Sequence, residues 1–514
     1  MNRNTRVLQR DRLCPCRNKL ITKVRQTLAV TEQITRAGID RAAAKGGQGF
    51  DGLRSKIALP VLFYFAAVML PININLGSIY LTGVRIVLIV MIIPLTLRLM
   101  AGKYGKILLT DILFFLHFIW IIVALGVNNP DQVIQNAGAT GIEFIGGYVL
   151  GRAYIRTAED FAALVRTLAI IAFCTLPFAL YETLTGHAII LNMLDKLPGS
   201  TSLRDLAIGK RMGLDRVQMV FTHPIHYGLF CSMALSLCFV GLRGLYSNGA
   251  RWTISIVVAA CGLLALSSGA LLAIILQIGL ISWAAIFAGT RKRWLFLLGL
   301  FAIAYVLIDI LSNRTPIMVF LSYATFSAST AYWRTLIFSY GMENVWAHPL
   351  FGLGLNDWAR PSWMRSGSMD NFWLVMAVRY GIPGWAFITG GYVLALWKIG
   401  RRDFDSDLVL WQFRRAWMFS FVGLTFTLTT VHVWHTLYSF VFFMFGAGMW
   451  MLSVQPKQIG AVPEAAPSPR GRPVPPQREA TVPVEAAMTI EPQSVEKPSP
   501  YTRFQTRKDR VGKP

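Results

Sequence analysis

Residues 291–311 read RKRWLFLLGLFAIAYVLIDIL, and this stretch decides the fold class. Three basic residues precede an apolar run over 294–311 whose one charged residue is Asp309. A run of about 18 or more apolar residues can cross the hydrocarbon core of a bilayer as a helix. Because basic residues mark the cytoplasmic end of such a helix, the stretch predicts a transmembrane helix that begins on the cytoplasmic side.

The composition of the whole chain agrees with this stretch. The 514 residues are 54% hydrophobic and 15% charged, with a mean hydropathy of +0.49, whereas soluble globular proteins carry about 25% charged residues. Similar runs recur, and we expect about twelve spans: 57–74, 79–99, 107–126, 135–151, 160–182, 223–243, 252–267, 270–288, 294–311, 370–397, 413–430 and 433–453. Because backbone in lipid must satisfy its own hydrogen bonds, we predict an all-α, polytopic transmembrane helical bundle.

Charge in the connections predicts the orientation of these spans. With a cytoplasmic N-terminus, every even-numbered connection is cytoplasmic, and each one is basic: Lys103 and Lys106; Arg152 and Arg156; Arg243 and Arg251; Arg291, Lys292 and Arg293; Lys398, Arg401, Arg402, Arg414 and Arg415. The short turns on the other side, such as 127–134 and 267–269, lack Lys and Arg. The pattern predicts two cytoplasmic termini and a turn at Ser267-Ser268-Gly269.

Three regions follow from composition and spans. Residues 1–56 are predicted to be a disordered, basic cytoplasmic N-terminus without a signal peptide, 57–453 the transmembrane domain, and 454–514 a disordered, Pro-rich cytoplasmic tail. Two external connections are long, 183–222 and 312–369, and such loops are where chemistry concentrates. The tails hold more than half of the formal net charge of +24. Since no folded basic module is recognisable, nucleic acid is not an expected partner.

The long external connections carry several cations: Lys210, Arg211 and Arg216 in the first, and Arg314, Arg334, Arg360 and Arg365 in the second. A guanidinium group can bind two phosphate oxygens at once and stays charged at physiological pH. The arginines therefore indicate a site for an anionic, phosphorylated ligand. The alternative is that they pair with carboxylates such as Asp215 and Asp357, or lie along the membrane surface.

The segment SMDNFWL at 368–374 places polar residues at the start of the tenth span. Ser368 or Asp370 could cap that helix by accepting a backbone N–H. Asp370 could also take a proton from a hydroxyl nucleophile at the water–lipid boundary. The two roles, helix cap and proton acceptor, are compatible, and the residue spacing alone does not choose between them.

Other patterns predict an absence of metal and nucleotide chemistry. The six cysteines and the histidines have no metal-ligand spacing, so neither a metal site nor a disulfide framework is expected. The segment FGLGLNDW at 351–358 superficially resembles a phosphate loop, but it lacks a following Lys and a preceding strand. Its glycines are interpreted as turn residues.

Two segments together resemble a known family. AYWRTLIFSYGMENVWAHPLFGLGL at 331–355 and MDNFWLVMAVRYGIPG at 369–384 are similar to the O-antigen ligase and O-antigen polymerase (Wzy-like) family of bacterial envelope proteins. The shared features are an Arg with a downstream aromatic, a Pro-Leu-x-Gly-x-Gly loop, a polar pair that opens a helix, and a Tyr-Gly-x-x-Gly end. The earlier segment KRMGLDRVQMVFTHPIHYG at 210–228 is similar too, so the resemblance covers about 57–453.

The resemblance implies a metal-independent glycosyltransferase without a cofactor in the bacterial inner membrane. It would transfer a glycan from undecaprenyl diphosphate to an acceptor hydroxyl on the periplasmic face, where loops 183–222 and 312–369 would lie. Expected partners are the lipid-linked oligosaccharide, membrane lipid, and other polysaccharide assembly and export proteins. The implied catalytic residues are Arg334 and Asp370, and the implied substrate-binding residues are Arg211, Arg216, Asn371 and His348.

Two departures from the family pattern bear on the activity. Ligases place His before Asn where this chain has Asp370, which favours a polymerase of the exopolysaccharide branch over a ligase that uses lipid A-core. Relatives often carry Ser-Arg-Gly where this chain has Ser267-Ser268-Gly269, so one arginine of the usual set is absent. The alternatives are a ligase, a flippase for the same lipid, with Asp111, Glu143 and Asp309 as its intramembrane charges, and a non-catalytic assembly partner.

Overall fold

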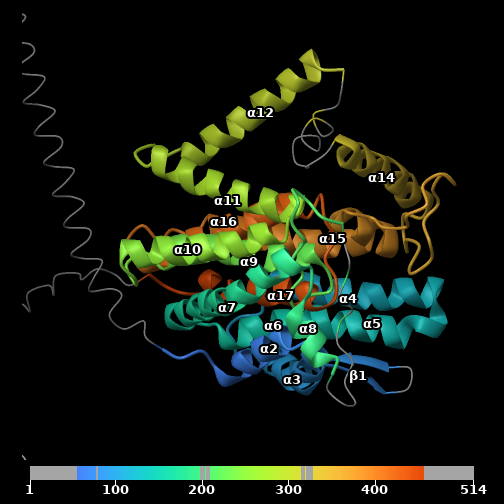
Figure 1. The fold of residues 1–514 in the computed structure, drawn as a ribbon, viewed down its shortest axis with the longest axis horizontal. Coiled ribbons are helices and arrows are strands. Elements are labelled where there is room, and N and C mark those ends of the chain that lie inside the picture. Colours follow the sequence, from blue (N-terminus) through green and yellow to red (C-terminus); the bar gives the residue numbers. More distant parts are fainter. Residues whose placement is uncertain are drawn as a thin grey trace, which may run out of the picture. The chain divides into compact units, whose positions relative to one another are not determined.

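The computed structural model describes residues 55–456, apart from 77–78, 197–202, 204–205, 207–208, 314–315, 317–318 and 320–327. The described part of the chain is mostly helical (Figure 1). In chain order its helices, strands and short 3-10 or π segments are α2 (Leu59–Met69), β1 (Asn73–Leu76), β2 (Ile79–Thr82), α3 (Gly83–Met100), α4 (Leu109–Asn128), η1 (Pro130–Gln132), α5 (Val133–Gly141), η2 (Ile142–Gly146), α6 (Gly147–Tyr154), α7 (Ala158–Thr185), α8 (Ile189–Leu194), α9 (Pro224–Ser236), η3 (Leu237–Gly241), α10 (Asn248–Leu264), α11 (Ser268–Ile286), α12 (Arg293–Leu311), α14 (Ala328–Ala347), α15 (Phe372–Gly400), α16 (Leu408–Thr427), α17 (His435–Gly446) and η4 (Met449–Leu452).

The chain divides into two compact units, Met1–Ile459 and Gly460–Pro514, and all described residues belong to the first. The predicted disordered N-terminus and tail, together with Arg314, therefore lie outside the described residues almost entirely.

Each predicted span coincides with helix in the structure, and eight helical segments among the described residues are long and apolar enough to cross a membrane. These eight are 83–100, 109–128, 158–185, 224–241, 268–286, 293–311, 372–400 and 435–452. The other four predicted spans correspond to α2, the α5–η2–α6 run, α10 and α16, which are shorter, interrupted or less apolar. The structure supports a multi-pass helical membrane protein, and the count of twelve stays a prediction.

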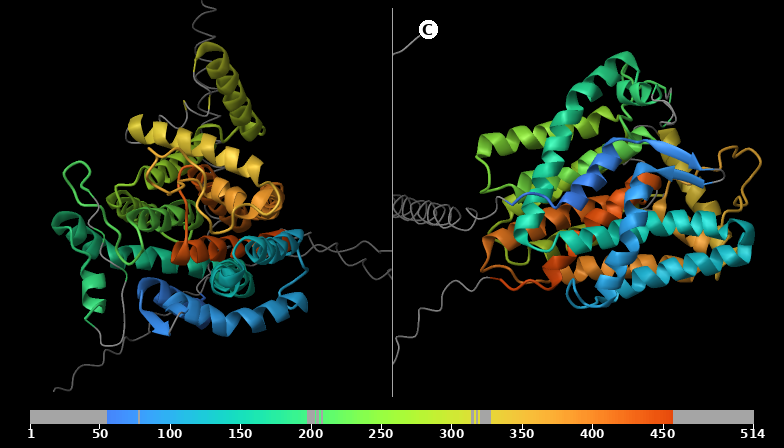
Figure 2. Two further views of the ribbon diagram at one scale, coloured as in Figure 1. Left: turned by 90° about the vertical axis from the view of Figure 1, so that its right-hand side faces the viewer. Right: turned by 90° about the horizontal axis from the view of Figure 1, so that it is seen from below.

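Helix α17 is almost fully buried, as is α9, and aromatic rings join α17 to its neighbours. Its Phe443 lies 4.9 Å, centroid to centroid, from Tyr64 of α2, and its Phe445 lies 4.8 Å from Tyr392 of α15. In the left view of Figure 2, α17 in red lies between the α2–α3 segment in blue and the green and yellow helices. In contrast α12 has no buried residue (Figure 1), as expected for a helix that faces lipid on most sides.

Two features differ from the predicted all-helical pattern. Strands β1 and β2 pair antiparallel, with Asn73 opposite Thr82. The segments NINL and IYLT contain Ile, Tyr and Thr, which suit a strand. Helix α14 lies inside the connection 312–369, which was predicted as a loop because its mean hydropathy is too low for a span.

The Pro-Leu-x-Gly-x-Gly segment is a turn that repairs a break in α15. Gly381, with φ of 69°, interrupts the helix, and Pro383 has no N–H to donate to the carbonyl of Arg379. Gly354 donates to that carbonyl instead, at 2.9 Å. Likewise the N–H of Leu353 donates to the carbonyl of Val378 (2.8 Å), and the N–H of Ile382 donates to the carbonyl of Pro349 (2.7 Å).

This exchange satisfies backbone groups that would otherwise be stranded within an apolar bundle. Gly352 and Gly354 have φ values of 63° and 61°, and a Cβ on Gly352 would lie 2.5 Å from the carbonyl oxygen of Val378. The structure thus confirms the interpretation of these glycines as turn residues.

Two of the three intramembrane acidic residues form buried ion pairs. Asp111 of α4 lies 3.0 Å from the Nε of Arg152 and accepts the hydroxyl of Tyr148 at 2.5 Å. Glu143 of η2 lies 2.8 Å from the Nε of Arg85 in α3. Both carboxylates tie neighbouring helices together, while Asp309 lies exposed on α12.

Candidate functional site

Several helices begin at one end of the bundle, close to one another. The N–H of Phe372, which opens α15, donates to Leu428 and Val431, just before α17. The ring of His226 in the first turn of α9 lies 4.1 Å from that of Trp434, the N-cap residue of α17. A Cβ on Gly269, in the first turn of α11, would lie 2.4 Å from Val431. The N-termini of α9, α11, α15 and α17 therefore converge, and each contributes partial positive charge.

The segment 209–223 is held against this end by the C-terminal part of α7. The buried carboxylate of Glu182 accepts hydrogen bonds from the backbone N–H groups of Gln218 (2.6 Å) and Met219 (3.1 Å). The hydroxyl of Thr183 donates to the carbonyl of Asp215 at 2.8 Å. These bonds fix the backbone on both sides of Arg216, so this arginine is carried by an ordered segment.

Arg211 and Arg216 reach the turn between α10 and α11. Arg211 donates from Nη1 to the carbonyl of Leu266 at 2.7 Å, and the Nε of Arg216 lies 3.5 Å from the carbonyl of Ala265. Ser267 caps α11 at this turn, which confirms the predicted division of the long apolar stretch. This is the position where relatives were expected to carry an arginine that the chain lacks. Two arginines from the preceding connection deliver positive charge to the same turn.

Arg334 lies on α14 and is buried, with 8% of its surface exposed. Its Nε and Nη1 have no hydrogen-bond partner among the described residues. Burial lowers the pKa of Arg334, the charge of Asp370 opposes that shift, and Arg211 adds to it. Arg334 therefore lies within electrostatic range of both residues. A buried guanidinium with two unused donors is costly unless a ligand binds it.

Asp370 is half-buried and is not the helix cap. Asn371 caps α15, with its side-chain oxygen accepting the N–H of Leu374 at 3.1 Å. Asp370 accepts a hydrogen bond from the hydroxyl of Ser368 at 2.9 Å. The expectation that Ser368 or Asp370 forms the cap is wrong, because the helix begins one residue later than predicted. The carboxylate of Asp370 is left for the arginines and for a ligand.

His223, the N-cap residue of α9, completes the cluster. Its Nδ1 accepts the N–H of Ile225 at 3.1 Å, so its proton resides on Nε2. Burial and the charge of Arg216 lower the pKa of His223 to about 4, and Asp370 acts against them. His223 is therefore a neutral donor among charged groups. The sequence showed it only as a histidine at a helix start, and no pattern indicated that Arg216 and Asp370 would approach it.

We name Arg211, Arg216, Arg334, Asp370 and His223 the arginine cluster. Burial lowers the pKa of Arg216 to about 10, which leaves it charged at neutral pH. Three cations face one carboxylate, an excess positive charge of two. Excess charge of this kind in a partly buried site favours a multivalent anion such as a diphosphate.

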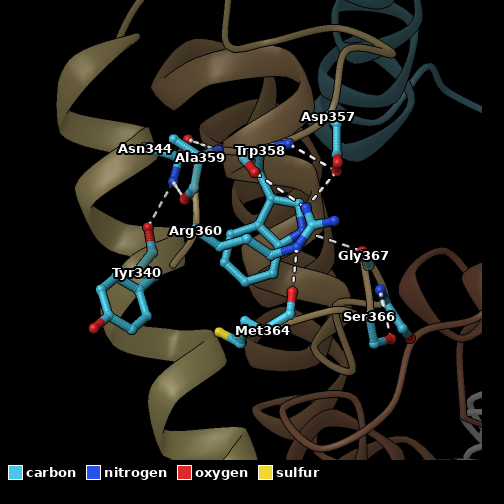
Figure 3. Close-up of polar contacts among 10 residues, drawn as sticks. Tyr340, Asn344, Asp357, Trp358, Ala359, Arg360, Met364, Ser366 and Gly367 are labelled. Carbon is cyan, nitrogen blue, oxygen red and sulfur yellow. Dashed lines mark hydrogen bonds and ion pairs between the residues drawn. The ribbon is translucent and has the colours of Figure 1, made fainter. Parts of the chain in front are cut away.

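The connection from α14 to α15 is ordered by its own contacts, shown in Figure 3. Arg360 donates to Asp357 at 2.6 Å and to the carbonyl of Met364 at 2.9 Å, and it stacks on Trp358. The side chain of Asn344 bonds the backbone of Ala359 in both directions, at 2.8 and 2.9 Å. Pairing with a carboxylate, the alternative reading of the external arginines, is thus correct for Arg360.

Two residues that the resemblance implies as substrate-binding, His348 and Asn371, are not part of the arginine cluster. His348 is exposed just beyond the C-terminal end of α14, about 20 Å along the helix from Arg334 at 1.5 Å per residue. Asn371 is adjacent to Asp370, but its oxygen is used by the cap. Among the described residues no group of three or more His, Cys, Asp or Glu could hold a metal ion.

One comparison with known proteins gives a match. Residues 253–389 match the family model described as O-antigen ligase (Wzy_C), and the match includes Arg334, Asp370 and the α15 break. No curated protein matches the chain. The match covers roughly a quarter of the sequence and excludes Arg211 and Arg216. Together with the apolar helices, it indicates a multi-pass membrane protein in which residues 253–389 are similar to the O-antigen ligase family.

Proposed function

We propose that the chain is a polysaccharide polymerase that transfers a glycan from undecaprenyl diphosphate to a sugar hydroxyl. The observation that carries this proposal is the buried Arg334, whose two unused N–H donors lie near Asp370 in a cluster with excess positive charge. The family match independently favours a lipid-linked glycan as the substrate. The negative charge of that lipid's diphosphate would balance the excess positive charge of the arginine cluster.

The proposed reaction is a single displacement. The acceptor oxygen forms a bond to the anomeric carbon of the donor sugar as the bond from that carbon to the diphosphate oxygen breaks. The acceptor proton passes to Asp370, which then releases it to water. The diphosphate leaves with growing negative charge, which Arg211, Arg216 and Arg334 stabilise. His223 adds a neutral N–H donor toward the same anion.

Asp370 favours polymerase over ligase in this proposal, since ligases of the family place histidine at this position. A flippase is less consistent with the described residues, because Asp111 and Glu143 are consumed by ion pairs between helices. The periplasmic location of the cluster and the bacterial inner membrane as the location of the chain belong to the same proposal.

Replacing Asp370 by Asn tests this proposal. The change removes the charge and keeps the shape, and the helix cap is untouched because Asn371 supplies it. In a strain that lacks the chromosomal copy, we expect Asp370→Asn to lower polysaccharide yield by about 100-fold or more, as for loss of a general base, with single-repeat lipid accumulating on the outer face. Asp357→Asn in the same connection is the matched control and should restore wild-type polymer. Full-length polymer at normal yield from a normally expressed Asp370→Asn protein would contradict the catalytic role.

A further inference from the structure

A second concave site lies beside the arginine cluster. A pocket of about 80 Å³ opens between the β1–β2 hairpin, the start of α3, Thr222 and the first turn of α17. This volume is several times what one water molecule needs. Thr222, which lines the pocket, directly precedes His223 of the arginine cluster in the chain, so the pocket adjoins the cluster at this residue.

The lining of the pocket differs in kind from that of the arginine cluster. Its polar groups are an amide, three hydroxyls and an imidazole, from Asn73, Thr82, Thr222, Thr436 and His435. Its remaining lining is apolar or glycine, and no Asp, Glu, Lys or Arg is among the described residues that line it. Neutral polar groups set in apolar walls suit an uncharged ligand with hydroxyls and C–H surfaces.

The hydrogen bonds already present leave hydroxyl donors unused among the residues that line the pocket. Thr82 accepts the N–H of Arg85 at 3.2 Å as the cap of α3, so its hydroxyl hydrogen is still available to donate. The hydroxyl of Thr436 has no hydrogen-bond partner among the described residues, and this residue lines the pocket. His435 is held from behind by the Arg85–Glu143 pair, at 3.4 Å and 3.7 Å respectively.

We propose that this pocket is a saccharide subsite that takes one hydroxyl-bearing edge of an uncharged sugar ring of the lipid-linked glycan. The inference rests on the proposed function, since a diphosphate in the arginine cluster puts the attached or incoming sugar within reach of the pocket. The ligand chemistry is a neutral hexose-type ring with several hydroxyls. Its source is either the donor glycan or the acceptor.

The test uses the full chain in lipid nanodiscs and two variants of the pocket. Thr436→Val removes the unpartnered hydroxyl at constant shape, and Ala67→Leu fills the space. Thr253→Val, on an exposed part of α10, is the matched control. The probes are undecaprenyl diphosphate, which carries no sugar, and the lipid-linked repeat extracted from a strain lacking this protein.

We expect Thr436→Val to raise the KM for the lipid-linked repeat about two- to tenfold, as for loss of one hydrogen bond. Ala67→Leu should raise it further, while both variants bind undecaprenyl diphosphate as the wild type does. An unchanged KM in both variants would overturn the subsite. If the wild type itself forms no polymer, the proposed function fails instead, so the two failures are distinguishable.

The free repeat oligosaccharide, released from its lipid, separates the two sources. It lacks the diphosphate and can act only as an acceptor. A raised KM for this oligosaccharide in Thr436→Val assigns the pocket to the acceptor sugar. A raised KM for the lipid-linked donor, measured with saturating free oligosaccharide, assigns it to the donor sugar.

Discussion

The charge of Asp370 acts on Arg334, yet no hydrogen bond or ion pair joins the two residues in the described part of the chain. This separation leaves room for a ligand group between cation and carboxylate. The leaving diphosphate would satisfy the buried N–H groups of Arg334, while the acceptor hydroxyl would approach Asp370. The cap at Asn371 permits this division, because it relieves Asp370 of a structural duty.

Two histidines at this end of the bundle predict how stability depends on pH: His223 of the arginine cluster, and His432, whose ring lies 5.7 Å from that of Trp434. Burial lowers the pKa of His223 to about 4 and that of His432 to about 3 in the folded protein, below the 6.5 of an exposed histidine. The unfolded chain therefore binds more protons between pH 6.5 and 4, and stability falls as the pH falls through that window. His223→Asn keeps a residue that can cap α9 and removes the ring.

We expect the thermal midpoint of the wild type in detergent to drop between pH 6.5 and pH 4.5, and to drop less in His223→Asn. Because His223 stays neutral above pH 6, chain-extension activity should show no inflection from it near pH 6.5. An equal drop in both proteins would show that His223 is not held neutral.

Arg211, Arg216, Arg334 and Asp370 could be named from the sequence because arginines and a carboxylate stand out in external connections and because the family resemblance covers them. The structure brings them within electrostatic range of one another, and their roles in binding and catalysis stay predictions. His223 could not be named in this way, because its place in the cluster depends on Asp370, which lies far away in the sequence. Nor could spacing separate Asp370 from Asn371 as the cap, since helix boundaries read from sequence are uncertain by a residue or two.

At the scale of elements, the docking of the Pro349–Gly354 segment into the α15 break positions the start of α15. Hydropathy predicted a continuous span here, and it could not reveal that two segments trade backbone hydrogen bonds. A helix pattern likewise did not stand out in α14, where apolar residues are diluted by polar ones. Long apolar helices such as α12, in contrast, were predicted to within a residue or so, because a single period and composition specify them.

Gly381→Ala tests the α15 break. A Cβ at this position would lie 2.1 Å from the carbonyl oxygen of Leu350, and the φ of 69° is unfavourable for alanine. We expect a loss of stability of about 2 kcal/mol or more, seen as a lower thermal midpoint and a lower yield of folded protein. Gly279→Ala, in a helix where a Cβ meets nothing within 4 Å, is the control and should be neutral or stabilising. Equal midpoints for the two variants would exclude the proposed packing.

At the scale of the whole molecule, the basic residues that are predicted to be cytoplasmic lie at the opposite end of the bundle from the arginine cluster. Arg152 donates to the carbonyl of Lys106 at 2.8 Å, and Arg415 lies within electrostatic range of Arg243 and Arg293. Basic residues predicted to be cytoplasmic thus meet at the ends of their helices, away from the N-termini of α9, α11 and α15. The positive-inside pattern could predict this separation because it depends only on counting charges between spans.

Cysteine labelling checks the predicted orientation. Ser366 lies exposed in the connection before α15, and Ser406 lies exposed between α15 and α16. In intact cells we expect a membrane-impermeant maleimide to label Ser366→Cys and to leave Ser406→Cys unlabelled until the membrane is opened. The unsubstituted protein sets the background. The reverse pattern would place the arginine cluster on the cytoplasmic face and contradict the proposed substrate.

The most direct test of the central claim is chain extension by the purified protein in nanodiscs, with the lipid-linked repeat as sole substrate. We expect longer lipid-linked glycans and the release of one undecaprenyl diphosphate for each glycosidic bond formed, without added nucleotide sugar or metal. We also expect Arg334→Lys, which keeps the charge and loses the guanidinium fork, to extend chains at least about tenfold more slowly and to bind undecaprenyl diphosphate more weakly. Absence of extension by the wild type, or equal rates for wild type and Arg334→Lys, would contradict the account.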